Sequence, residues 1–93
     1  MATKKTTKKI KRKKIYRLVV SYPVALYAWG SLDDRLERLA RRDADGHGTG
    51  FGLRDSDFTF EKPAERDAAI KRIKATKLLG LKYYKYNYFE NRY

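Results

Sequence analysis

Residues 50–73 constrain the fold of this 93-residue chain more than any other stretch. In two runs, 50–54 and 57–61, large apolar residues alternate with small or polar ones, which is typical of half-buried strands. Asp55 and Ser56 lie between the runs, and their short side chains can hydrogen-bond the nearby backbone of a turn. The sequence therefore predicts a β-hairpin with its turn at these two residues.

A helix is expected directly after the hairpin, over residues 63–75. Pro63 suits its first turn, because the fixed φ of proline matches a helix and the missing N–H is not needed there. Ala69, Ile70 and Ile73 recur at helical spacing and predict the side that packs on the core.

The rest of the chain adds three elements and a loop. Residues 14–22 and 81–89 are predicted to be strands, and residues 31–42 a helix with Ser31 as its N-cap. Residues 43–49 are expected to form a flexible glycine-rich connector. The order strand–helix–strand–strand–helix–strand predicts an α+β, ferredoxin-like sandwich, in which a four-stranded antiparallel sheet carries two helices on one face.

The N-terminal end differs from the rest in composition. Residues 1–13 are rich in lysine and low in complexity, so they cannot bury enough surface to fold alone. We expect a disordered Lys-rich arm over residues 1–13 and a single ferredoxin-like domain over residues 14–93. A chain of this size buries somewhat over ~60% of its unfolded surface, which leaves no room for a deep cleft between domains.

Positive charge is concentrated at the two ends of the chain. The net charge is +12; residues 1–17 hold nine positive charges and no negative ones, residues 18–67 have a net charge of −3, and residues 68–93 one of +6. Such asymmetry suggests a polyanionic partner, and we expect nucleic acid rather than a membrane. The basic N-terminal residues would also serve as a solubilising tail or a nuclear localisation patch.

Several classes of protein are excluded or not expected. The chain has no cysteine, and therefore no disulfide, no thiolate metal site and no cysteine nucleophile. No apolar run approaches the ~18 residues of a membrane-spanning helix, and no apolar segment of a secretory signal follows the basic N-terminus. We therefore expect a cytoplasmic protein.

Catalysis and metal binding are not expected either. The connector at 43–49 contains an Asp-Gly pair and a His-Gly-Thr run, but the carboxylates of a calcium loop and the nucleophile motif of a subtilisin-type protease are missing. A Cas2-like nuclease would need an aspartate at the end of the first strand, where Ser21 and Tyr22 stand. Asp55 and Asp57 would need a third acid to form a catalytic site. The sequence predicts no enzyme, no cofactor and no metal.

Residues 58–63 (Phe-Thr-Phe-Glu-Lys-Pro), followed by Ala-Ala-Ile at 68–70, resemble the third strand and second helix of RNA-recognition-motif domains. Those domains stack bases on aromatic side chains of their sheet. When the two are aligned on these residues, Asp55 and Asp57 occupy the stacking positions of the third strand. The resemblance therefore implies the fold, and the binding residues are not carried over.

The last predicted strand is dense in tyrosine. If Tyr83 faces the helices, the following tyrosines face the open side of the sheet with Arg17 and Arg54, where rings for base stacking meet cations for phosphates. The expected nucleic-acid-binding residues are these tyrosines and the cations of the ends and strands: Lys4, Lys5, Lys8, Lys9, Lys11, Arg12, Lys13, Lys14, Arg17, Arg54, Lys71, Lys74, Lys82, Tyr84, Tyr86 and Tyr88. Packing of the tyrosines within their own core, or a surface for a protein partner, remain as other interpretations.

The sequence thus predicts a small, basic, non-catalytic protein that binds RNA or single-stranded DNA, such as a structural component of a ribonucleoprotein. The alternative is a protein-interaction module, for example a small phage-type inhibitor or an assembly factor that acts on a nucleic-acid-associated protein. Its contact would be the apolar segment 24–29. A homodimer through an edge of the sheet is also open.

Overall fold

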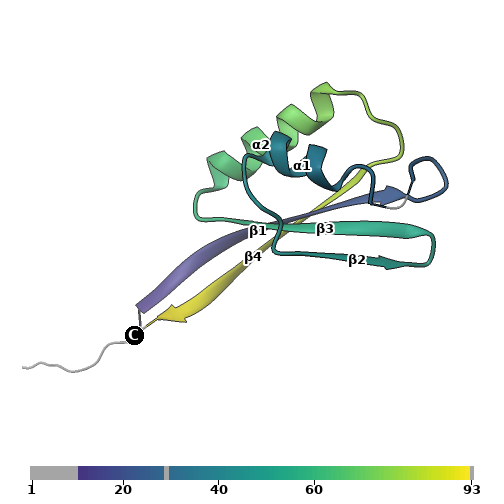
Figure 1. Ribbon diagram of the computed structural model, residues 1–93. Coiled ribbons are helices and arrows are strands. Elements are labelled where there is room, and N and C mark those ends of the chain that lie inside the picture. The colour runs from purple at the N-terminus through teal and green to yellow at the C-terminus, as the bar shows by residue number, and fades with distance from the viewer. Residues whose placement is uncertain (1–10, 29, 93) are drawn as a thin grey trace, which may run out of the picture.

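A computed structural model describes residues 11–28 and 30–92, with residues 11, 91 and 92 described by their backbone alone. It contains a four-stranded antiparallel sheet and two helices, which confirms the predicted α+β class. The elements in chain order are β1 (Lys11–Pro23), α1 (Asp33–Ala40), β2 (Gly46–Gly50), β3 (Leu53–Phe60), α2 (Pro63–Ala75) and β4 (Lys82–Arg92). Both helices lie on the same side of the sheet (Figure 1).

The strands are ordered β2-β3-β1-β4, and each is antiparallel to its neighbours. β1 pairs with β3 through its residues 16–23 and with β4 through its residues 11–21. Residues opposite each other in paired strands share a face of the sheet, so this register assigns each strand residue either to the helix side or to the open side.

The core lies between the sheet and the helices. It is formed by side chains of β1, β3 and the helical layer, all at most 6% exposed: Leu18, Val20, Tyr22, Leu32, Leu36, Ala40, Phe58, Phe60, Ala69 and Ile73. Each large apolar side chain buried in this way contributes roughly 1.5–3 kcal/mol. Because Leu18, Val20 and Tyr22 of β1 are in this core, the odd-numbered residues of β1, among them Arg17, face the open side.

The predicted position of the hairpin turn was wrong. β2 lies mostly in the segment 43–49 that was expected to be a flexible connector, and the turn is formed by Phe51 and Gly52, with φ of 52° and 76°. Positive φ at both central residues is typical of the type I′ turn, whose twist matches that of the strands it joins. Asp55 and Ser56 lie inside β3 and pair with β2. Ser56 is fully buried.

The helix predictions differ in their outcome. The bounds of α2 are those predicted, with Pro63 in its first turn. α1 is shorter than predicted, and its N-cap is Leu32 instead of Ser31, because the first helical hydrogen bond runs from the N–H of Leu36 to the carbonyl of Leu32. Neither helix of the described residues is long and apolar enough to cross a membrane.

β1 and β4 extend beyond the rest of the sheet as a two-stranded ribbon (Figure 1). The last residue of β3 lies opposite Tyr16, whereas β1 and β4 pair as far as Lys11 and Arg92. Residues 11–13, which the sequence placed in the arm, are therefore part of β1. Residues 1–10 of the predicted arm lie outside the described part of the chain.

Candidate nucleic-acid interface

Three tyrosines form a row along the open side of the edge strand β4. Tyr84, Tyr86 and Tyr88 are 42%, 53% and 39% exposed. Tyr83 packs against the core, so the alternation of the strand directs these three rings to the opposite side. Lys82 is exposed on the same side at the beginning of the row.

Arg17 lies on this side between the tyrosine row and a carboxylate of β3. It is directly opposite Tyr86, and its Nη2 atom forms an ion pair of 2.5 Å with Asp57. In the ribbon, Lys13 forms a second ion pair, of 2.7 Å, with Glu61. The open side thus has an aromatic half on β4 and an acidic half on β3, separated by cations that already have carboxylate partners.

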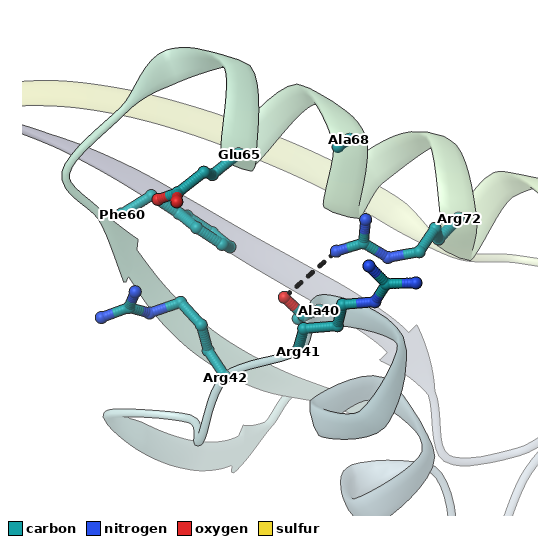
Figure 2. Close-up of a pocket in the computed structure, with 7 residues that line it drawn as sticks. All are labelled: Ala40, Arg41, Arg42, Phe60, Glu65, Ala68 and Arg72. Atoms are coloured by element: carbon teal, nitrogen blue, oxygen red, sulfur yellow. Dashed lines mark hydrogen bonds between the residues drawn. The ribbon is translucent and has the colours of Figure 1, made fainter.

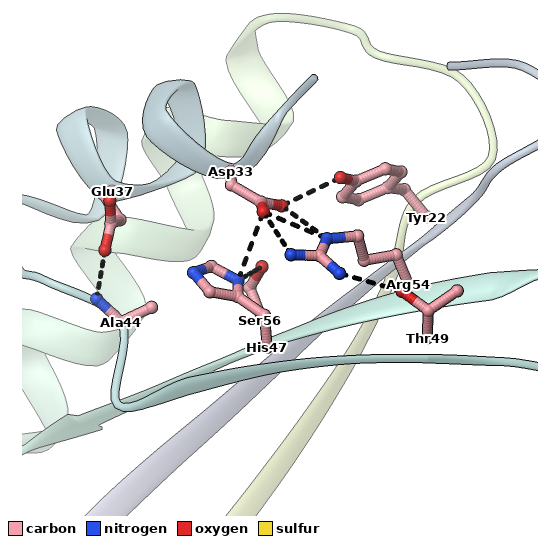
Figure 3. A network of polar contacts seen from close by, with 8 residues as sticks. All are labelled: Tyr22, Asp33, Glu37, Ala44, His47, Thr49, Arg54 and Ser56. Atoms are coloured by element: carbon pink, nitrogen blue, oxygen red, sulfur yellow. Dashed lines mark hydrogen bonds and ion pairs between the residues drawn. The ribbon is translucent and has the colours of Figure 1, made fainter. Parts of the chain in front are cut away.

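Arg54 does not belong to this surface, and its predicted placement was wrong. The sequence predicted a turn directly after Arg54. In the structure β3 continues without a turn from Leu53 to Phe60, so Arg54 lies on the same side of the strand as the core residues Phe58 and Phe60. Arg54 is 8% exposed on the helix side. Its guanidinium donates hydrogen bonds of 2.6 to 3.1 Å to both carboxylate oxygens of Asp33 and one of 2.8 Å to Thr49 (Figure 3).

Asp33 is the centre of this polar network. The hydroxyl of Tyr22 donates to Asp33 Oδ1 at 2.9 Å, and His47 Nδ1 lies 3.7 Å from Oδ2 and 2.9 Å from Ser56 Oγ. Burial acts to raise the pKa of Asp33, but the hydrogen bonds from Arg54 and Tyr22 and the nearby charges outweigh it and lower this pKa. Burial and the hydrogen bond to Asp33 raise the pKa of Tyr22. The network joins α1 to β1, β2 and β3 and is a structural one.

The ribbon carries a second group of cations and rings, on its helix side. The guanidinium of Arg12 lies 4.7 Å from the centre of the Phe89 ring, and the ammonium of Lys14 lies 6.0 Å from the same centre and 5.6 Å from that of Tyr16. Phe89 is 55% exposed. Cations held above rings in this way remain available to phosphates. Four predicted sites, Lys4, Lys5, Lys8 and Lys9, lie outside the described residues, and Lys11 is described by its backbone alone.

The cations of α2 belong to the helical layer and not to the open side. The predicted sites Lys71 and Lys74 are exposed there. Arg72 donates to the carbonyls of Leu39 at 2.5 Å and Ala40 at 3.3 Å, and it thereby satisfies the C-terminal end of α1.

A small cavity of about 220 Å³ between the two helices was not predicted from the sequence. Arg41, Arg42 and Arg72 line it together with Glu65 of α2 and Phe60, and the guanidinium of Arg42 lies 5.4 Å from the centre of the Phe60 ring (Figure 2). Burial and the charge of Arg41 lower the pKa of Arg72. The sequence could not show this convergence, because the arginines belong to two helical segments about 30 positions apart.

An apolar patch lies at the opposite end of the sheet from the ribbon. Leu26 and Leu79 are 60% and 74% exposed, and the hydroxyl of Tyr27 donates to the Leu79 carbonyl at 2.8 Å. This patch includes part of the apolar segment predicted as a protein contact; Trp29 of that segment lies outside the described residues.

No group of three or more His, Cys, Asp or Glu side chains converges as metal ligands would, over residues 11–28 and 30–92. Comparison of the chain with known protein families, with curated proteins and with solved structures gives no match. A functional proposal therefore rests on the geometry of the chain itself.

Proposed function

We propose that this protein is a non-catalytic nucleic-acid-binding protein that holds RNA or single-stranded DNA along the open side of β4. The observation that carries the proposal is the row of exposed rings at Tyr84, Tyr86 and Tyr88 beside a basic ribbon. Successive rings of such a row are ~6.8 Å apart along the strand, about twice the spacing of stacked bases. Aromatic stacking accepts every base, so we expect little sequence preference.

The charge distribution supports a ligand that follows β4. Lys82 stands at one end of the tyrosine row on the open side, and the exposed Arg12 and Lys14 of the ribbon lie past the other end, on the helix side. On the β3 side, the carboxylates of Asp57 and Glu61 neutralise Arg17 and Lys13, so this half offers no net positive charge to phosphates. A ligand lying along β4 would therefore meet Lys82 on the open side, and it would pass Glu90 and the edge of β4 before reaching the cations on the helix side of the ribbon.

We also infer that the arrangement is ferredoxin-like. α1 connects β1 to β2, and β3 lies between these two strands in the sheet. α2 connects β3 to β4, and β1 lies between them in the order β2-β3-β1-β4. This supports the ferredoxin-like fold predicted from the element order. We also propose a cytoplasmic location, in keeping with the proposed nucleic-acid partner.

Fluorescence anisotropy with labelled single-stranded RNA, single-stranded DNA and duplex DNA at two salt concentrations tests the proposal. We expect single strands to bind more tightly than the duplex, and the affinity to fall steeply with salt as counterion release requires. An affinity weaker than millimolar for every polyanion at low salt would refute it.

The exposed Leu26 and Leu79 favour a second candidate, a protein-interaction module such as a small phage-type inhibitor or an assembly factor acting on a nucleic-acid-associated protein. Exposed apolar patches often mark protein contacts. Under this proposal, Leu26→Asp abolishes capture of a protein partner and leaves oligonucleotide affinity unchanged. Loss of oligonucleotide affinity in a folded Leu26→Asp protein would assign the patch to the first function instead.

A further inference from the structure

β4 is a long edge strand that pairs on one side only, among the strands described. It has eleven residues and no proline, and it exposes aromatic rings on both of its faces, Tyr86 on the open side and Phe89 on the helix side. The other edge strand, β2, has five residues, of which three are glycines. A long edge rich in aromatic residues is a template for another strand, and β2 is a poor one.

We propose that two copies of this chain associate through β4, antiparallel to each other, with a two-fold axis that passes beside Tyr86. A two-fold axis perpendicular to the sheet pairs a strand with its own copy and keeps the helix sides of both copies together. A residue that lies a given number of positions before Tyr86 is then opposite the residue that lies the same number of positions after Tyr86 in the second copy.

This register is self-complementary in charge and in side-chain type. Lys82 lies opposite Glu90 of the second copy, on the open side, and the two-fold axis makes this contact twice. Tyr84 lies opposite Tyr88 of the second copy on the same side. Opposite charges and aromatic pairs directly across an antiparallel ladder stabilise it. Glu90 would then lie between Lys82 of the second copy and Lys13 of its own chain.

The neighbouring registers are disfavoured by like charges. An axis at Lys85 places that lysine directly opposite itself, and an axis at Asn87 places Lys82 opposite Arg92. Like charges directly opposite each other destabilise antiparallel strands. An axis at Tyr86 avoids both juxtapositions.

Pairing in this register also gives the inner part of the ribbon a third strand. Residues 88–90, which extend past β3, lie opposite residues 82–84 at the start of β4 in the second copy. A two-stranded ribbon is marginally stable by itself, and a third strand satisfies the outer backbone groups of its β4 half. On the open side, the tyrosine rows of the two copies meet at the axis; the use of this joint surface for bases rests on the proposed function, whereas the dimer does not.

Sedimentation equilibrium of the full chain, freed of nucleic acid, tests the dimer independently of any binding activity. Salt of about 0.3 M screens the repulsion between two chains of net charge +12. We expect a dimer whose dissociation constant rises about tenfold or more in Lys82→Glu and in Glu90→Lys, because two attractive pairs become repulsive in each. The double variant Lys82→Glu/Glu90→Lys should restore the dimer, and Arg35→Glu, the same charge change on α1, should leave it unchanged.

Cysteine cross-linking reports the register directly, since the chain has no cysteine of its own. Residues directly opposite each other have Cα atoms roughly 4.5–5.5 Å apart, within the span of a disulfide. Tyr86→Cys should cross-link to itself on oxidation. Tyr84→Cys should not, but a mixture of Tyr84→Cys with Tyr88→Cys should.

A monomeric wild-type chain would overturn the proposal, as would a dimer that both charge reversals leave intact or a Tyr86→Cys protein that does not cross-link. A dimer with this register that fails to bind any oligonucleotide would leave the dimer established and refute the proposed function.

Discussion

Arg54 and Asp33 are joined by three hydrogen bonds of 2.6 to 3.1 Å, and this pair connects β3 to the first turn of α1. Their side chains are 10% and 14% exposed. Removal of one partner of a buried ion pair leaves the other charge unsatisfied, which is strongly destabilising. The attachment of α1 to the sheet therefore depends on the charge of Asp33.

Asp33→Asn should lower the stability at neutral pH by roughly 2 kcal/mol, because the hydrogen bonds to a charged acceptor are lost. The pKa of Asp33 is lowered in the folded protein from an ordinary value of 3.8. Its charge thus stabilises the fold at pH values above about 3.8, and this contribution disappears as the pH falls through the folded pKa. Thermal unfolding between pH 2 and pH 7 measures both effects.

Asp34→Asn is the matched control, since Asp34 is exposed in the same helical turn. It should keep the acid dependence of the wild type, whereas Asp33→Asn should flatten it. An Asp33→Asn protein with the stability and acid profile of the wild type would contradict the role of the network.

Local signals account for what the sequence predicted correctly. α2 was predicted because Pro63 marks a start and the apolar positions recur at helical spacing, both of which are local properties. The hairpin was misplaced because the alternation of β3 continues through Asp55 and Ser56, while an aromatic residue, Phe51, occupies the turn. The partner of Arg54 could not be predicted, because Asp33 lies 21 positions away on a different element.

The turn at Phe51 and Gly52 gives a prediction of increased stability. Phe51 has a φ of 52° and an exposed ring, so its left-handed backbone is strained and no burial compensates for it. Asn-Gly is the preferred pair of a type I′ turn, and Phe51→Asn should stabilise the protein by about 0.5–1 kcal/mol. Gly52→Ala should destabilise it by about 1 kcal/mol, since its φ is 76°.

Urea unfolding measures both hairpin variants, and an unchanged m-value would show that the midpoint shift is one of stability. A loss of stability in Phe51→Asn would show that the phenyl ring contributes to the folded state in spite of its exposure.

Arg66 connects α2 to β4 and gives a prediction about the edge strand. It is 6% exposed, and its Nη1 atom donates to the Tyr86 carbonyl at 3.2 Å and to Asn87 Oδ1 at 2.7 Å. Arg66→Ala should destabilise the protein by roughly 2 kcal/mol and increase amide hydrogen exchange in β4. Lys71→Ala, at an exposed position of the same helix, is the control. Equal exchange in β4 in the two variants would contradict this connection.

The tyrosine row gives a prediction that separates stacking from charge. Alanine substitution of an aromatic platform residue costs ~1–3 kcal/mol per stacked base, so Tyr86→Ala should weaken binding of a single-stranded oligonucleotide about 5- to 150-fold. Tyr86→Phe keeps the ring and should keep the affinity. Neither variant removes a phosphate contact, and the slope of affinity against salt should stay unchanged in both.

Lys14→Ala, in contrast, should change the slope of affinity against salt. Lys14 is exposed in the ribbon, with its ammonium 5.6 Å from the Tyr16 ring, so its removal deletes a cation and leaves the tyrosine row intact. One phosphate contact fewer lowers the salt slope for a single strand by about 0.7, and it weakens RNA and DNA equally. Anisotropy titrations over a series of salt concentrations measure both quantities on the same samples. If Tyr86→Ala changes the slope, or if Lys14→Ala leaves it as in the wild type, then stacking on β4 and phosphate binding by the ribbon are not the two parts of the interface.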